Sequence, residues 1–209
     1  MPRAKIIIIG TSHISPSSVT ATRSRILREQ PDCVAVELDP IRYRALLNPQ
    51  HASMRSGTTA WLLHTLQSHL GRSTGVLPGS EMLTAIEAGR AVGAQVVLID
   101  MSINMIMANM RAISLKSRLG MIARLMAGVT LGARKINLSE VPDERMVKQV
   151  LKYMSVKMPE FYKVLVSDRN AYMAGWIKDL AKKHKKIIVV VGMGHTAGLK
   201  KLLNIKAKK

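Results

Sequence analysis

Near the start of the chain lies the apolar segment Lys5-Ile6-Ile7-Ile8-Ile9-Gly10-Thr11-Ser12-His13, around which we expect the fold to be organised. Its four consecutive isoleucines are β-branched and leave neither face polar, which favours a strand buried on both sides of a parallel sheet. The run therefore predicts a central strand. Gly10 allows the backbone to turn where the run ends. His13 follows just past the carboxyl end of the strand, where ligand-binding groups collect in open α/β sheets.

The same pattern returns near the other end of the chain. Lys186-Ile187-Ile188-Val189-Val190-Val191 is a second β-branched run, and Gly192-Met193-Gly194-His195 follows it. Both predicted strands thus end in Gly-x-x-His. If the strands are parallel in one sheet, His13 and His195 project from the same edge and can share one site. A single motif of this kind is usually a turn followed by a solvated or hydrogen-bonded histidine, and two copies are more informative.

Length and composition indicate a packed globular protein in a reducing compartment. The chain has 209 residues, is 47% hydrophobic and contains one cysteine, Cys33, inside an apolar run. These values fit one domain without a disulfide framework. The opening apolar run is too short for a signal peptide, and no uncharged stretch is long enough to span a bilayer. We expect a cytoplasmic protein, or the cytoplasmic soluble domain of a membrane-associated protein.

The charge balance is strongly basic. There are 32 lysines and arginines against 13 acids, which gives a net charge of +19. Such a field attracts acidic partners, and an anionic membrane surface is one candidate. Nucleic acid is a weaker candidate, because aromatic residues make up only 3% of the chain and no recognition motif is present. The methionine-rich stretch 101–135 makes a homodimer interface another candidate.

Hydrophobic periodicity predicts an α/β fold, with helices on both faces of a mostly parallel central sheet. We expect a single domain over residues 1–209 with a helical insertion at about 102–158, before the last strand. Two helices broken near Ile113-Ser114 are expected within the methionine-rich stretch. The remaining predicted elements are helices at 17–29, 41–47, 58–70, 81–92, 160–183 and 197–203, strands at 33–38, 95–99 and 186–191, and a loop at 71–79.

Acidic residues in apolar strands are conspicuous in so basic a chain. Glu37 is the only charged member of the strand predicted at 33–38, and burying it is costly unless it meets a cation, a metal or several donors. An ion pair with Arg42 or Arg44 would satisfy it, and so would a metal site with the two histidines. Asp100 ends the third predicted strand. Arg169 lies mid-helix in a largely apolar context.

Six segments, in their order and spacing, resemble the TraB/PrgY/GumN family over nearly the whole chain. They are Ile9-Gly10-Thr11-Ser12-His13, Ala35-Val36-Glu37-Leu38 with Arg42-Tyr43-Arg44, Gly79-Ser80-Glu81-Met82 with Ala85-Ile86-Glu87, Val97-Leu98-Ile99-Asp100, Ser167-Asp168-Arg169 with Tyr172-Met173-Ala174, and Val191-Gly192-Met193-Gly194-His195. Where many relatives carry a basic residue after the third-strand aspartate, this chain has Met101.

The resemblance implies an α/β domain related to the Tiki proteases and, more distantly, to erythromycin esterase and the ChaN haem-binding proteins. Tiki proteins are metal-dependent proteases whose paired Gly-x-x-His motifs, a glutamate and an arginine form the active site. The matching positions here are His13, His195 and Glu37, with Arg169 or Arg42 as the arginine. PrgY-like members are associated with blocking a peptide pheromone.

The leading hypothesis is a metal-dependent hydrolase that acts on a peptide or protein substrate. His13 and His195 would bind a divalent metal, and Glu37 would be the third ligand or the base that activates water. Manganese, cobalt and zinc all suit these donors. Arg169 first, and Arg42 second, would hold Glu37 or stabilise the oxyanion. Contacts to the substrate, or to the side chains that bind the metal, are expected from Gly10, Thr11, Ser12, Arg44, Asp100, Gly192 and Gly194.

Two other classes of function stay open. The same histidines could serve a non-catalytic binding protein for haem, a metal or a peptide pheromone. Charge alone would suit a basic protein associated with a membrane surface or with nucleic acid.

Overall fold

The computed structural model of the chain describes residues 4–11, 16–48, 79–130 and 144–205. Its elements are β1 (Lys5–Thr11), α1 (Pro16–Glu29), β2 (Cys33–Val36), α2 (Pro40–Leu47), α5 (Ser80–Ala91), β3 (Gln95–Leu98), α6 (Ile103–Ala112), α7 (Leu115–Thr130), α8 (Glu144–Lys157), α9 (Pro159–Tyr162), the π-helix η1 (Lys163–Ser167), α10 (Asp168–Leu180), β4 (Lys186–Gly192) and α11 (Met193–Leu202). The helix predicted at 58–70 and the loop predicted at 71–79 lie outside the described residues, apart from Gly79.

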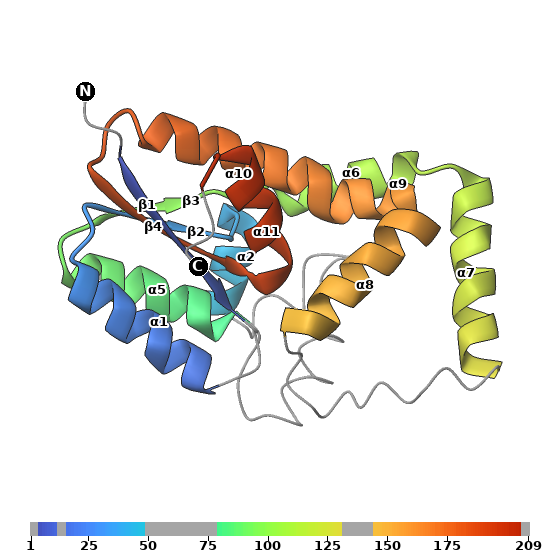
Figure 1. Cartoon of the computed structure of the whole chain (residues 1–209), viewed down its shortest axis with the longest axis horizontal. Coiled ribbons are helices and arrows are strands. Elements are labelled where there is room, and N and C mark those ends of the chain that lie inside the picture. Colours follow the sequence, from blue (N-terminus) through green and yellow to red (C-terminus); the bar gives the residue numbers. More distant parts are fainter. Residues whose placement is uncertain (1–3, 12–15, 49–78, 131–143, 206–209) are drawn as a thin grey trace.

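The four described strands form one parallel sheet in the order β1-β4-β2-β3. The two β-branched runs from opposite ends of the chain are direct neighbours, with Gly10 paired to Val191 and Thr11 to Gly192. Helices cover both faces of this sheet (Figure 1), so the predicted α/β fold is confirmed. Because the strands are parallel, their carboxyl ends share one edge and their amino ends share the other.

Side chains of β4 alternate between the two faces of the sheet. Ile187, Val189 and Val191 pack in the core beneath α10 and α11. Ile188 and Val190 point the other way and pack beneath α1 and α5. All five are fully buried, as the period of two in a strand covered on both faces requires. The long apolar run in this segment is therefore explained by helices on both sides (Figure 1).

The prediction that residues 5–9 form a central strand is wrong for the described sheet. β1 is an edge strand whose only described neighbour is β4. Ile6 to Ile9 are half-buried, whereas the matching residues of β4 are buried. An apolar run indicates that both faces of a strand are covered, here by helices. It does not indicate how many strands flank that strand.

Cys33 begins β2 and has no exposed surface. Burial, with a smaller contribution from the charge of Asp32, raises the pKa of its thiol to about 11. A protonated, inaccessible thiol is inert. The prediction of a small core residue is confirmed.

The described residues between β3 and β4 are mostly helical. The predicted break near Ile113-Ser114 is confirmed, since α6 ends at Ala112 and α7 begins at Leu115. Phe161 and Val164 pack with Ile106 and Ile113 in a third cluster of buried side chains. Figure 1 shows α7 at the end of the molecule far from the strands.

Among the described residues, no helix is both long enough and apolar enough to cross a membrane.

Truncating a buried side chain of β4 tests how much this strand contributes to the stability of the core. Ile188→Ala should lower the free energy of unfolding by about 2–5 kcal/mol, because it leaves a cavity under α1 and α5. The matched exchange Ile41→Ala removes a side chain that is 44% exposed on α2. It should change stability by only about 0.5 kcal/mol. Urea unfolding followed by circular dichroism measures both, and equal losses would contradict this account of the core.

Candidate functional site

The site is built at the edge of the sheet where the parallel strands end. Glu37 comes directly after β2, Asp100 follows β3 after one intervening residue, and Gly192 is the last residue of β4. Helix α11 begins at Met193, four residues earlier than predicted, which puts His195 in its first turn. The topology therefore brings one acidic side chain from each of two strand ends and a histidine to the same place.

Glu37 is held from two sides. Its Oε2 accepts a hydrogen bond from the backbone N–H of Gly192 at 2.6 Å. Its Oε1 accepts a hydrogen bond from the guanidinium of Arg169 on α10. The carboxylate is only 8% exposed, so these charge-assisted bonds replace the water it loses. Arg169, rather than Arg42 or Arg44, is the arginine that meets Glu37.

Arg169 is also bound to a second carboxylate. Its Nε and Nη2 donate to the two oxygens of Asp100 at 3.0 and 2.6 Å, in the bidentate arrangement that suits a guanidinium. Its Nη1 donates to the carbonyl of Leu165, in the π-helix that precedes α10. Burial alone would lower the pKa of Arg169, but its bonds to Asp100 and its proximity to Glu37 raise it above the usual value.

Arg42 extends the network away from Glu37. Its guanidinium donates to Asp100 and to Asp39. Asp39 is fully buried and also caps α2, where its side chain accepts from the N–H groups of Ile41 and Arg42. Burial would raise the pKa of Asp100, but the bonds and charges of Arg169 and Arg42 outweigh it and hold this pKa below its usual range.

His195 lies between Asn170 and Glu37. Its Nδ1 is 2.8 Å from Oδ1 of Asn170, and its Nε2 is 3.3 Å from Oε1 of Glu37. An amide oxygen accepts only, so Nδ1 carries the hydrogen in this orientation. Nε2 is then the nitrogen presented to the carboxylate. Gly198 permits the contact, because a Cβ there would lie 2.2 Å from Nδ2 of Asn170.

The end of β1 is fixed against the same helix. Gly10 approaches α11 so closely that a Cβ there would lie 2.6 Å from Cγ2 of Thr196, the residue after His195. Thr11 is buried, and its hydroxyl lies 3.4 Å from Oε1 of Glu81 on α5. Ser12 and His13 follow immediately and lie outside the described residues, so the structure gives no position for the predicted first histidine.

Two of the predicted outer residues stand apart from this cluster. Arg44 is exposed on α2 and forms no ion pair with any described residue. Gly194 is on α11, and among the described residues a Cβ there would approach only Leu151, at 3.9 Å. Three buried polar residues at this edge were not predicted: Asn170, Glu81 and Asp39. Asp39 before Pro40 was a readable helix cap, and Asn170 a polar residue beside Arg169 in an apolar helix.

His195 and Glu37 supply an imidazole nitrogen and a carboxylate oxygen, which are ligand types for first-row divalent metals. Among the described residues, no group of three histidines, cysteines or acids could hold a metal ion. A third ligand would therefore have to come from outside the described residues, where His13 lies.

The sequence profile of the TraB/PrgY/gumN family matches residues 2–209. The chain belongs to this family. The fold gathers the TraB-family segments around Glu37, Asp100, Arg169 and His195 at a single sheet edge.

Several relatives match nearly the whole chain. An "uncharacterized protein" of Methanocaldococcus jannaschii is 29% identical over 218 residues, which cover 95% of this chain and 54% of that protein. A "TraB domain-containing protein" of Bos taurus and one of Homo sapiens are each 24% identical to this chain over 237 residues. Each alignment covers 95% of this chain and 62% of the relative. The chain thus spans less than two thirds of the length of these relatives.

Replacing Asp100 tests the arginine network. Asp100→Asn keeps the size of the side chain but leaves two half-buried guanidinium groups, those of Arg42 and Arg169, short of a negative charge. We expect the free energy of unfolding at neutral pH to fall by about 3–5 kcal/mol. Asp179→Asn, at an exposed ion pair with Lys182, should change stability little.

The pH dependence of this difference has a defined sign. The pKa of Asp100 is lower in the folded chain than its usual value, so its charge stabilises the fold above the unfolded pKa of about 4. That contribution is lost as the pH falls through the folded pKa. Urea unfolding at several pH values should therefore show the gap between wild type and Asp100→Asn narrowing below about pH 4. A gap that stayed constant would contradict the network.

Proposed function

We propose that this TraB-family protein is a metal-dependent hydrolase that acts on peptide bonds. His195 and His13 would bind the metal, and Glu37 would be the third ligand or the base. Asn170 and Arg169 would position these groups. Both the metal and the reaction are inferences from the donor atoms and from the family resemblance.

One observation carries the proposal: Nε2 of His195 faces Oε1 of Glu37 at 3.3 Å. When the ring is uncharged and its hydrogen is on Nδ1, bonded to Asn170, His195 presents the Nε2 lone pair to a carboxylate oxygen that also carries lone pairs. Two such atoms repel unless a proton or a metal cation lies with them. The pairing of an imidazole with an oriented outer acceptor is typical of metal-binding histidines.

Glu37 is oriented by the protein before any ligand arrives. Gly192 and Arg169 hold its two oxygens, which leaves the Oε1 lone pair on the His195 side for a proton or cation. Arg169 is shared with Asp100, so its charge is already balanced in part within the fold. This supports a role for Arg169 in holding Glu37 in place more than a role as an oxyanion donor.

The position of β1 supports His13 as the partner of His195. Gly10 is packed against Thr196, and Thr11 pairs with Gly192 in the sheet. His13 is two residues beyond Thr11, a reach of about 7 Å for an extended chain. Manganese, cobalt and zinc each fit two imidazoles and a carboxylate. The chemistry such an ion supplies when bound is a water that ionises near neutral pH.

Metal content is the first test. Protein purified without chelator and incubated with Mn²⁺, Co²⁺ or Zn²⁺ should retain one equivalent after gel filtration, measured by mass spectrometry of the element. His195→Ala and His13→Ala should each lose most of it. His184→Ala is the matched control, because His184 lies at the opposite edge of the sheet beside the start of β4, and it should bind as wild type does.

Hydrolysis is measured on the same proteins with a library of fluorescent peptides. Wild type with metal should cleave peptides, whereas Glu37→Gln and His195→Ala should not. Full metal content in both histidine variants, together with unchanged cleavage in Glu37→Gln, would overturn the proposal. Metal binding that depends on both histidines, without cleavage of any peptide, would reject the hydrolase and identify a binding protein built on the same site.

Asn170 is tested as a positioning residue. Asn170→Ala removes the acceptor of the Nδ1 hydrogen, and we expect metal affinity to fall about 10–100-fold. The same exchange at the exposed Asn48 should leave affinity unchanged. Titration with a metal indicator dye gives the affinities, and circular dichroism verifies that both variants fold. Equal affinity in the two variants would show that Asn170 does not act through His195.

A further inference from the structure

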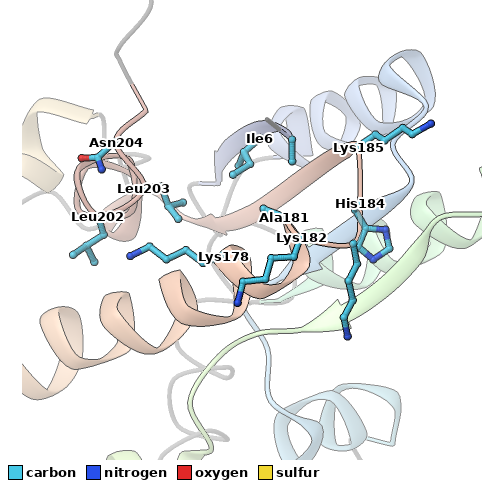
Figure 2. Close-up of a pocket in the computed structure, with 11 residues that line it drawn as sticks. Ile6, Lys178, Ala181, Lys182, His184, Lys185, Leu202, Leu203 and Asn204 are labelled. Atoms are coloured by element: carbon cyan, nitrogen blue, oxygen red, sulfur yellow. The ribbon is translucent and has the colours of Figure 1, made fainter. Parts of the chain in front are cut away.

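A second feature lies at the opposite edge of the sheet, where the strands begin. A cavity of about 840 Å³ opens there between the start of β1 and the ends of α10 and α11 (Figure 2). The residues that line it are Ala4, Ile6, Lys178, Ala181, Lys182, Lys183, His184, Lys185, Leu202, Leu203 and Asn204. None of them belongs to the site around Glu37 and His195.

The lining has an apolar part and a cationic part. Ile6, Ala181 and Leu203 are at the margin of the hydrophobic core between the sheet and α10 and α11. The lysines surround them and are exposed. Figure 2 shows Lys178, Lys182 and Lys185 projecting in different directions instead of converging on one point. Diverging cations around an apolar patch fit an extended surface of many anions better than a single bound phosphate.

Most of this positive charge is not neutralised within the described part of the chain. Lys178, Lys183 and Lys185 form no ion pair with any described residue, and Lys182 pairs with the exposed Asp179 at 2.6 Å. Asp32 lies nearby, but its carboxylate accepts from the backbone N–H groups of Lys185 and Lys186 at 2.7 and 2.8 Å. The edge therefore presents a net cationic surface.

We propose that this amino edge of the sheet is a docking surface for a bilayer that contains anionic phospholipids. Lysines at the rim would contact headgroup phosphates, while Leu202, which is 40% exposed, and the apolar floor would meet the acyl boundary. A nucleic acid fits less well, because the described residues that line the cavity include no arginine and, apart from His184, no aromatic ring to stack on bases.

Docking in this way would leave the other site free. The seven residues of β4 separate the two edges by roughly 23 Å. A bilayer on the amino edge would place the carboxyl edge, with Glu37 and His195, on the side away from the lipid. The proposal does not depend on metal binding or hydrolysis, and each can fail without the other.

Vesicle co-sedimentation of the whole chain is the test. The protein should sediment with phosphatidylcholine vesicles that contain phosphatidylglycerol, should not sediment with phosphatidylcholine alone, and should be released by salt. The triple variant Lys178→Gln, Lys183→Gln and Lys185→Gln should bind the anionic vesicles about 100-fold more weakly, given the contribution of each lysine near an anionic surface. Metal content of the triple variant should equal that of wild type.

The matched control removes the same charge elsewhere. Lys116→Gln, Lys152→Gln and Lys157→Gln change three exposed lysines on α7 and α8 and should reduce vesicle binding much less. Leu202→Ser, which changes no charge, should weaken binding through loss of the apolar contact. Equal loss in the two triple variants would overturn the proposal, since binding would then follow net charge. Binding of duplex DNA at salt concentrations that abolish vesicle binding would also overturn it.

Discussion

The ion-pair network centred on Arg169 is the interaction on which the carboxyl edge of the sheet depends. This single guanidinium joins Glu37 after β2 to Asp100 after β3, and it comes from a helix that packs across the sheet. Both carboxylates are almost fully buried, and a buried carboxylate is costly without a cationic partner. Arg42 extends the network, because its guanidinium pairs with both Asp100 and Asp39. The network thereby fixes the spacing of two strand ends and one helix.

His195 is placed by constraints of a different kind. It projects from the first turn of α11, whose start follows β4 without a loop. Close packing then limits its neighbours: Gly198 makes room for Asn170 against α11, and Gly10 lets β1 touch Thr196. These contacts hold His195 with its Nε2 facing Oε1 of Glu37. The proposed metal binding rests on this arrangement. The two glycines matter because any side chain at either position would occupy the space of a neighbour.

The two edges of the sheet have opposite character. Acids, arginines and a histidine meet in a buried cluster at the carboxyl edge, whereas exposed lysines surround an apolar cavity at the amino edge. In a sheet of parallel strands such polarity is simple to maintain, because every strand contributes its start to one edge and its end to the other. A surface that associates with a partner and a site that acts on a ligand can then occupy one small fold without competing.

Much of this arrangement was predictable from local chemistry. Two β-branched runs ending in Gly-x-x-His predicted parallel strands with a common edge, and Glu37 and Asp100 were identified because acids are costly at apolar strand ends. The number of strands that flank β1 was not predictable. Helices that cover both faces of a strand are enough to explain an isoleucine run, whether the strand is central or at the edge. The π-helix before Arg169 was not predicted either. Neither was the contact of Asn170 with His195, because it joins two helices that are separated along the chain.

The family, the α/β class and the chemically capable residues could all be read from the amino-acid sequence, because hydrophobic period, glycine placement and isolated charges are local properties. The strand order, the pairing of Glu37 with Arg169 instead of Arg42, and the approach of Asn170 to His195 became known from the folded chain alone. Burial makes an unpaired charge or polar atom costly, and packing in three dimensions, rather than distance along the chain, sets which groups can pair.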